Sequence, residues 1–393
     1  MALEIVKGVY SVGVKDFKRR VFDSIIPLPK GTTYNSYLII GSEKCALIDT
    51  VNPGFEQELL RNISEIADPS RIDYIVMNHA EPDHANAIPF MLEKAKNAKL
   101  IVSRVGAGAA KDYYEVPQER IVVVDEKTEI QLGGKTLRFI NAPMLHWPET
   151  MFTYLAEDCV LFPCDFFGQH LAIEQNFDAE IDGKELEEHA KHYFGEIMMP
   201  FRAFGQQALK KLESYNVKII APSHGLVFTN PAKILSDYGK WTSGKLETKV
   251  LIAYVTMWGS CRKMADALEN ELSKKGVKCM KFDLTSADLG DVARELVDSA
   301  CIVLSAPSFD GNVHPTAAYG AYLVRCIKPP AKYAAVISSY GWAPSGAKSV
   351  AELLAPLNLE IIGVVEAKAR PKEADMQKVA ALAGAIAQKV NAI

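Results

Sequence analysis

Residues 77–85 read Met-Asn-His-Ala-Glu-Pro-Asp-His-Ala and continue an apolar run that begins at residue 72. Within six positions this segment offers two imidazoles and two carboxylates, the side chains that bind metal ions, at His79, Glu81, Asp83 and His84. On a helix, positions 79 and 83 would share one face while position 81 pointed away, and Pro82 disfavours a helical interior. We therefore expect a strand-to-helix loop that aims all four side chains at one point.

Three more candidate ligands each follow an apolar run and precede a turn: His146, Asp165 and His224. An isolated histidine is more often structural, but four of the eight histidines in the chain fall in this constellation. Side chains at strand ends are held rigidly enough to form a metal site. The sequence thus predicts a metal centre of seven ligands, against the alternative of a solvated charged loop at 79–84. It assigns no role to the remaining histidines, at positions 170, 189, 192 and 314.

A polar stretch at 242–248 divides the chain into two parts with different patterns. After it, β-branched runs at 250–255, 301–306, 333–339 and 359–365 alternate with helical patterns such as 262–276. This alternation predicts parallel crossovers and a doubly wound α/β sheet. We expect one domain at 1–247 and a second at 248–393.

The first part is richer in strands, with helical patterns between them, which predicts two sheets sandwiched by helices, an α+β arrangement. The expected strands are 37–40, 45–49, 74–77, 100–102, 121–124, 136–141, 151–155, 159–162 and 218–221. The expected helices are near 55–67, 86–95, 107–114, 184–195 and 203–214.

Composition excludes several classes of protein. The 393 residues carry a net charge of −4, which removes the basic footprint of a general nucleic-acid binder. No apolar run approaches the roughly 18 residues of a membrane span, and the first residues do not read as a secretory signal. The seven cysteines include no C-x-x-C pair, so no rubredoxin-like or zinc-ribbon module is expected in this chain. We expect a cytoplasmic protein.

The segment 254–264 ends the first strand of the second part and precedes an amphipathic helix. Hydroxyls and backbone N–H groups at a helix N-terminus bind phosphate. The loop lacks the dinucleotide pattern G-x-G-x-x-G and resembles a flavodoxin phosphate loop. Its candidate cofactor-binding residues are Thr256, Met257, Trp258, Gly259, Ser260 and Cys261.

Two further loops, at 306–312 and 339–342, follow strands at the edge where a doubly wound sheet binds its ligand. Their candidate residues are Pro307, Ser308, Phe309, Asp310, Ser339, Tyr340, Gly341 and Trp342. The aromatic rings of Trp258, Phe309, Tyr340 and Trp342 offer faces for an isoalloxazine ring; the alternative is ordinary interface or core packing.

The ligand pattern resembles the metallo-β-lactamase fold, with Glu81 where the zinc hydrolases carry histidine. Two divalent ions bring four positive charges, and Glu81, Asp83 and Asp165 supply three negative ones, so one bridging hydroxide would neutralise the centre. An oxygen-rich, nearly neutral site suits iron better than it suits zinc. Asp165 is the natural bridge between two ions.

Taken together, the two halves resemble the flavodiiron proteins over essentially the whole chain. Matching motifs are Gly31-Thr-Thr-Tyr-Asn35, 79–84, Met144-Leu-His-Trp-Pro148, Phe167-Gly-Gln-His170, Ala221-Pro-Ser-His-Gly225 and the Thr256 loop. The resemblance implies a diiron centre in a lactamase-like domain, FMN in a flavodoxin-like domain, and reduction of O2 to water, NO to N2O, or both. It also implies that His79, Glu81, His146 and Asp165 hold one iron, and that Asp83, His84, His224 and the shared Asp165 hold the other.

The sequence departs from the family pattern at several positions. Cys261 stands where threonine usually closes the phosphate loop, Cys164 stands where asparagine is common, and Glu149 replaces an aspartate. Many members also place a histidine before the first ligand, in the substrate pocket, whereas the segment 21–27 here has none. This altered pocket leaves the preference between O2 and NO open.

The main alternative is a zinc-dependent hydrolase with an appended flavodoxin domain, and a further one is a non-catalytic electron carrier. The resemblance implies a rubredoxin-like or other small electron donor. It also implies a head-to-tail homodimer, with further pairing into a tetramer as an alternative. No nucleic-acid or membrane partner is expected.

Overall fold

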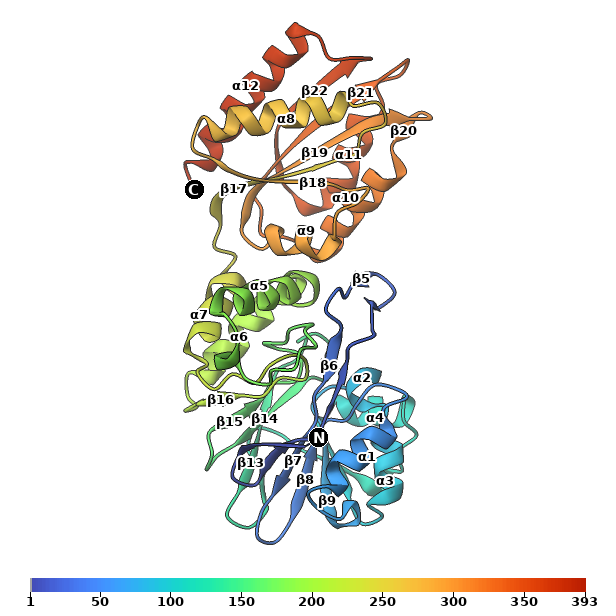
Figure 1. Ribbon diagram of the computed structural model, residues 1–393, viewed down its shortest axis with the longest axis vertical. Coiled ribbons are helices and arrows are strands. Elements are labelled where there is room, and N and C mark those ends of the chain that lie inside the picture. Colours follow the sequence, from blue (N-terminus) through green and yellow to red (C-terminus); the bar gives the residue numbers. More distant parts are fainter. Residues whose placement is uncertain (1) are drawn as a thin grey trace. The chain divides into compact units, whose positions relative to one another are not determined.

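The computed structural model describes residues 2–393, which divide into two compact units (Figure 1). The first unit comprises residues 2–193 and 201–239, and the second comprises residues 194–200 and 240–393. Within the described residues, no helix is both long and apolar enough to cross a membrane.

The first unit is built on two sheets that enclose a shared apolar core. The seven-stranded sheet has the order β1 (Leu3–Val6), β2 (Val9–Ser11), β7 (Tyr37–Ile40), β8 (Cys45–Ile48), β9 (Ile72–Met77), β10 (Lys99–Val102) and β11 (Ile121–Val123). The five-stranded sheet has the order β12 (Glu129–Gln131), β13 (Thr136–Asn141), β14 (Met151–Leu155), β15 (Val160–Phe162) and β16 (Ile219–Ile220). Side chains such as Ile48 and Val76 from one sheet and Phe139 and Phe162 from the other fill the space between them.

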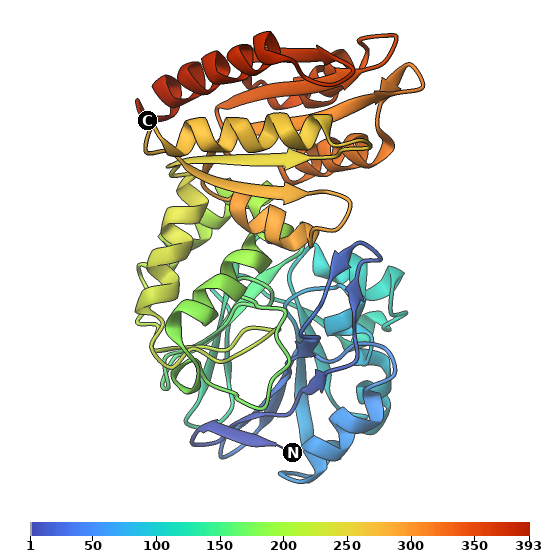
Figure 2. The same cartoon turned by 45° about the horizontal axis from the view of Figure 1, so that its top comes forward.

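Helices cover the outer faces of both sheets. Apolar side chains of α1 (Glu56–Ser64), α3 (Ile88–Lys94) and α4 (Gly106–Asp112) join a core cluster with the seven-stranded sheet. The helices α5 (Gly183–Tyr193), α6 (Arg202–Leu212) and the part of α7 (Ala232–Ser243) in this unit lie beside the five-stranded sheet (Figure 2). The predicted sandwich of two sheets between helices is confirmed.

The amino-terminal strands were not expected from the sequence. Besides β1 and β2, they form two small ribbons: β3 (Val14–Asp16) with β6 (Thr32–Tyr34), and β4 (Val21–Phe22) with β5 (Ile26–Pro27). Strands of two to four residues are too short to show a periodic pattern. The ribbon of β4 and β5 closes through the three residues 23–25, of which Asp23 and Ser24 have positive φ.

The second unit is a parallel sheet in the order β18 (Lys278–Asp283), β17 (Glu247–Tyr254), β19 (Ser299–Phe309), β21 (Tyr333–Tyr340) and β22 (Glu360–Lys368). In chain order this is 2-1-3-4-5, the flavodoxin-like winding. One face carries α8 (Ser260–Ser273) and α12 (Glu373–Val390); α9 (Leu289–Leu296), α10 (Pro315–Ile327) and α11 (Gly346–Leu354) cover the other. The predicted doubly wound sheet is confirmed.

Residues 194–200, although they lie within the first part of the sequence, belong to the second unit. Phe194–Met198 form a π-helical turn that packs against α9. A Cβ added at Gly195 would lie 2.6 Å from the carbonyl oxygen of Ala293, so this close approach requires glycine.

Three local features differ from what the sequence predicted or were missed. The polar stretch 242–248 is no continuous linker, since α7 runs to Ser243 and β17 begins at Glu247. The strand β18 was missed because lysines at 278 and 281 hide its pattern, and it is a half-buried edge strand. The predicted loop at 306–312 is extended as far as Phe309 and returns through β20 (Asn312–Val313).

Candidate metal and flavin sites

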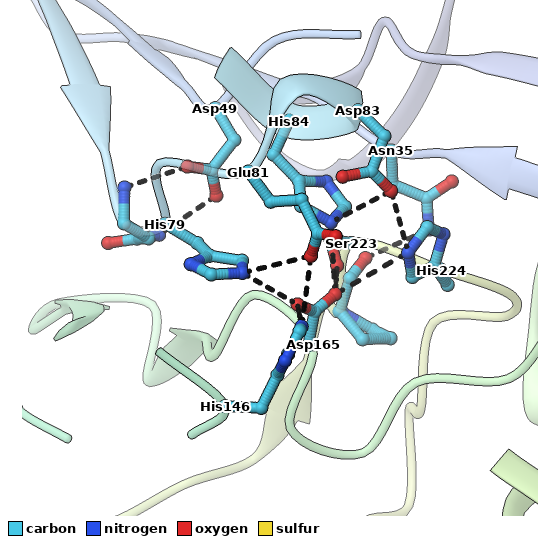
Figure 3. Close-up of polar contacts among 12 residues, drawn as sticks. Asn35, Asp49, His79, Glu81, Asp83, His84, His146, Asp165, Ser223 and His224 are labelled. Carbon is cyan, nitrogen blue, oxygen red and sulfur yellow. Dashed lines mark hydrogen bonds and ion pairs between the residues drawn. The ribbon is translucent and has the colours of Figure 1, made fainter. Parts of the chain in front are cut away.

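The seven predicted ligands lie together in the first unit, each beyond the carboxyl end of a strand (Figure 3). His79 follows β9, Asp165 follows β15 and His224 follows β16. His146 follows β13 in a turn, and the peptide bond before it is cis. Six of the seven are buried, and His146 is half-buried.

The expectation that the whole motif is a loop was wrong for its second half. Pro82–Ala85 form a one-turn helix, α2, with Glu81 as the residue before it. A proline at the first helical position loses no hydrogen bond, because the N–H at that position has no partner inside the helix. His79 and Glu81 therefore come from the loop and Asp83 and His84 from the helix, and all four still converge.

The first group of ligand atoms comes from His79, Glu81, His146 and Asp165, which follow the strands β9, β13 and β15. Nε2 of His79 lies 3.2 Å from Oε2 of Glu81, and Nε2 of His146 lies 2.9 Å from the same oxygen. Both nitrogens also face Oδ2 of Asp165, at 3.4 and 3.5 Å. These four side chains present two nitrogens and two carboxylates to one position, which suits a transition-metal ion.

The second group uses the other oxygen of Asp165. Nε2 of His84 lies 3.0 Å and Nε2 of His224 lies 3.4 Å from Oδ1 of Asp165. The same nitrogens lie 3.3 and 3.2 Å from Oδ2 of Asp83. Figure 3 shows Asp165 between the two groups, one oxygen turned to each, which is the geometry of a bridging carboxylate.

Side chains and carbonyls behind the ligands hold them in place. Nδ1 of His79 donates to Oε1 of Glu149 over 2.7 Å, and Nδ1 of His224 donates to the carbonyl of Thr33 over 2.5 Å. The hydroxyl of Ser223 donates to Oδ1 of Asp165 over 2.8 Å. Such contacts fix the tautomer and the direction of a metal-binding side chain.

Another buried carboxylate, Asp49, supports the loop that carries His79. Its two oxygens accept hydrogen bonds from the backbone N–H and the side-chain amide of Asn78, at 2.8 and 3.1 Å. Burial raises the pKa of Asp49 to about 6, against the opposing effects of His84 and these hydrogen bonds. Asp49 thus anchors the strand end just before the first ligand.

The ligands perturb one another strongly. Burial alone would lower the pKa of His84, but the carboxylates of Asp83 and Asp165 outweigh it and raise that pKa to about 9. The pKa of His146 is likewise raised to about 9 by Asp165 and Glu81, against the effect of burial. Burial raises the pKa of Asp165, yet His84 and His146 hold it well below its usual range. Buried carboxylates are thus kept ionised and need positive partners.

The donor set fits divalent metal ions. Both oxygens of Asp83, Nε2 of His84 and Oδ2 of Asp165 are buried and lack a hydrogen-bond partner within residues 2–393. Buried polar atoms without partners are costly, and a metal ion satisfies such atoms directly. The site has three carboxylate ligands, more than a typical structural zinc site uses, so the donor set also fits iron.

The candidate flavin residues gather at the carboxyl edge of the parallel sheet in the second unit. No side chain caps the N-terminus of α8, and Gly259, at positive φ, has open space where a Cβ would lie. The hydroxyl of Thr256 accepts from the N–H of Gly259 over 3.0 Å. Trp258 and Trp342 are 89% and 79% exposed, and Met257 and Phe309 are partly exposed. An uncapped helix start beside exposed rings fits a flavin with a phosphate tail.

Several candidate flavin residues have protein partners instead of open surroundings. The Cys261 thiol is fully buried and lies 3.3 Å from the hydroxyl of Ser339. The hydroxyl of Ser308 accepts from the N–H of Gly346 at the start of α11. Pro307, Ser308, Phe309, Ser339 and Tyr340 lie at strand ends and Asp310 in the β19–β20 turn, while Gly341 and Trp342 follow β21.

Sequence reasoning missed the partners behind the ligands. Glu149 was recognised only as a replacement for aspartate, and nothing near it in the sequence points to His79, 70 residues away. The ring of His170, a residue without a predicted role, lies 4.9 Å from the ring of His224, and Nδ1 of His170 is 2.9 Å from the hydroxyl of Thr32. A single sequence carries no signal for such pairings.

The fold and site define a protein with a metallo-β-lactamase-like unit bearing seven clustered metal-binding side chains and a flavodoxin-like unit. Residues 32–225 match the family described as ODP family beta lactamase. The chain is 34% identical over 392 residues to a nitric oxide reductase of Moorella thermoacetica, covering 98% of each chain. A coenzyme F420H2 oxidase of Methanothermobacter marburgensis is 32% identical over 92% of this chain and 91% of its own length.

Solved structures agree. Rubredoxin oxygen:oxidoreductase from Desulfovibrio gigas superposes with a TM-score of 0.96 at 29% identity, covering 100% of this chain and 99% of its own. The flavodiiron protein from Giardia intestinalis gives a TM-score of 0.95 at 28% identity, covering 100% and 97%. The chain belongs to the flavodiiron protein family. The named relatives are oxidoreductases, which favours the predicted flavodiiron oxidoreductase over the alternative of a zinc-dependent hydrolase.

Proposed function

We propose that this chain is a flavodiiron oxidoreductase that reduces O2 to water, NO to N2O, or both, with electrons delivered through FMN. The observation that carries the proposal is the bridging geometry: two ligand groups face opposite oxygens of Asp165. Because two-metal centres also occur in hydrolases, the parallel-sheet unit on the same chain, which can hold a flavin that delivers electrons, favours reduction over hydrolysis.

In this proposal His79, Glu81, His146 and Asp165 hold one iron, and Asp83, His84, His224 and Asp165 hold the other. When bound, the two irons supply electrons to the diatomic substrate, and FMN accepts electrons from a donor and passes them on. The burial of six ligands keeps bulk water away from the centre, and the half-buried His146 lies where a small molecule enters.

For the flavin we propose the residues predicted from the sequence. The hydroxyl of Thr256, the start of α8 at Gly259–Cys261 and the adjoining Ser339 form the phosphate end, supported by the uncapped helix. Trp258, Phe309, Tyr340 and Trp342 flank the ring, supported by the exposure of the two tryptophans. The first unit, predicted from the sequence as residues 1–247, then forms the diiron domain, and the second, predicted as 248–393, forms the FMN domain.

The proposed electron donor is a rubredoxin or a similar small redox protein, in keeping with the name of the similar rubredoxin oxygen:oxidoreductase. We place the protein in the cytoplasm, and all seven cysteines are free, in keeping with a reducing compartment. We also propose a head-to-tail homodimer, because closed two-fold pairs are the commonest oligomers.

Metal analysis tests the centre directly. Protein produced with iron and zinc both present should carry two irons per chain, and reduced protein should consume NO without air and O2 in air. Zinc as the dominant metal, with no reductase activity after iron is restored, would favour the hydrolase instead.

Complementation tests the dimer. A chain with Thr256→Ala and Ser260→Ala, which damages the phosphate loop, is mixed with a chain carrying Asp165→Ala. Heterodimers of the two should regain partial activity, because each supplies the cofactor that its partner lacks. A fully active monomer by light scattering, or no recovery in proven heterodimers, would contradict the head-to-tail arrangement.

A further inference from the structure

The two ligand groups differ in what lies behind their histidines. In the group with Glu81, Nδ1 of His79 donates to Oε1 of Glu149 over 2.7 Å. The same oxygen accepts the N–H of Ala80 over 2.9 Å, and Glu149 is 5% exposed. A carboxylate shielded from water therefore lies directly against the outer nitrogen of this ligand.

In the group with Asp83, neither outer nitrogen is hydrogen-bonded to a carboxylate among the described residues. Nδ1 of His224 donates to a backbone carbonyl, that of Thr33. Nδ1 of His84 is buried and has no hydrogen-bond partner within residues 2–393. The nearby Asp49 uses both oxygens on Asn78. No ligand of this group is thus paired with a second carboxylate among the described contacts.

A carboxylate behind a metal-bound imidazole makes the imidazole a stronger donor, and removing such a partner typically weakens metal binding about ten- to a hundredfold. Burial enlarges the effect, because charges interact more strongly where water is excluded. Each position has one carboxylate of its own, Glu81 or Asp83, and shares Asp165, whereas Glu149 hydrogen-bonds a ligand of the first position only.

We propose that Glu149 is a positioning residue that acts through His79 to make the two metal positions unequal. The position of His79, Glu81 and His146 holds its ion more tightly than the position of Asp83, His84 and His224. This rests on the proposed metal centre but not on its redox activity, and it applies to whichever divalent ion the chain holds.

The test is release of metal from the loaded full-length protein to an excess of chelator, followed by absorbance. The wild-type protein should lose its two ions in a fast and a slow phase. Asp83→Asn removes a ligand of the weaker position, so it should abolish the fast phase and leave the slow one. This assigns the slow phase to the position of His79.

Glu149→Gln isolates the charge, because an amide oxygen still accepts from both His79 and Ala80. It should speed the slow phase about ten- to a hundredfold and leave the fast phase unchanged. The matched control is Thr150→Val, because the Thr150 hydroxyl lies 3.4 Å from the same Nδ1 but is neutral and donates to the carbonyl of Trp147. This control should change the slow phase by less than about threefold.

A purely structural role predicts a different pattern. If Glu149→Gln released both ions as the wild type does, or sped both phases equally, the proposal would be overturned; so would single-phase release from the wild type. Should Glu149→Gln fold poorly by circular dichroism, Glu149→Asp keeps the charge and should keep the slow phase within about tenfold of the wild type. Loss of the slow phase in that variant would also overturn the proposal. Zinc in place of iron would refute the proposed activity while leaving this test intact.

Discussion

Each unit of this protein buries a cluster of carboxylates, and the two clusters are neutralised in different ways. In the second unit, Nζ of Lys249 lies 2.9 Å from Oε2 of Glu295 and also contacts Asp298, with Lys249 only 1% exposed. Arg294 adds a second cation, 3.1 Å from Glu295. Lys249 and Arg294 thus meet the two buried carboxylates, with Arg294 also paired to the more exposed Asp291 at 2.9 Å, and the chain supplies its own counter-charges.

The cluster of the first unit holds three ligand carboxylates and no lysine or arginine among its ion pairs in the described residues. Within residues 2–393, its cationic partners are histidines, which carry charge by taking up protons. Burial of charge is costly without a partner, so this cluster is complete only with metal ions bound. The comparison separates a structural charge cluster from a functional one by where the counter-charge comes from.

The largest expected effect comes from Asp165→Ala, which removes the one side chain that both groups share. We expect loss of both metal ions, because each group loses an anionic oxygen at its centre. His224→Ala should lose chiefly one ion, since His224 faces only the second group. Metal content per chain measures both variants; loss of a single ion from each would contradict the bridging assignment.

The second expected effect is a pH dependence of metal binding. The pKa values of His84 and His146 are raised to about 9 in the metal-free chain, so both hold protons at pH 7 and must release them to bind an ion. Affinity should therefore rise with pH from 7 and level off above about 9. The slope is roughly tenfold per pH unit for each proton displaced. Calorimetry in buffers of different ionisation enthalpy counts these protons, and a pH-independent affinity over this range would contradict the sign.

The third effect tests the self-neutralised cluster. Lys249→Met leaves two buried carboxylates without their cation and should lower the free energy of unfolding by about 3–5 kcal/mol. Lys281→Met is the matched control, because Lys281 contacts Asp266 and Glu269 with its side chain 24% exposed, and it should cost about 1 kcal/mol or less. Urea denaturation compares the two. Metal content should stay unchanged in both; equal stability losses would mean that burial of the pair is not the cause.

The smallest expected effect concerns the flavin site. The Cys261→Thr variant should bind FMN at least as tightly as the parent, because a hydroxyl donates a hydrogen bond better than a thiol does. The gain in binding free energy should be at most about 1 kcal/mol. Cys261→Ser is the control, since it supplies a hydroxyl without the added methyl group at this fully buried position. Fluorescence titration with FMN measures both. If Cys261→Thr binds FMN more weakly than the parent and Cys261→Ser does not, the space beside Ser339 has no room for the methyl group.

The sequence by itself determined the class of fold in both halves and the membership of the ligand cluster. Strand and helix periodicities are local, so alternating runs after residue 248 were enough to predict a doubly wound sheet. Histidine, aspartate and glutamate can also be recognised individually as candidate metal ligands. Their placement after apolar runs predicted that these side chains converge at strand ends. Where local patterns were weak, as in the lysine-rich β18 and the helix at Pro82, the same reasoning failed.

Only the tertiary structure decided which atoms meet. That Asp165 turns one oxygen to His79 and the other to His84, that Glu149 backs His79, and that Lys249 pairs with Glu295 are contacts between residues 46 or more positions apart. Such contacts are set by how strands are ordered and how sheets pack, and a single sequence does not encode them in any local pattern. The physical reason is that burial makes every polar atom find a partner, and the fold determines which partner is within reach.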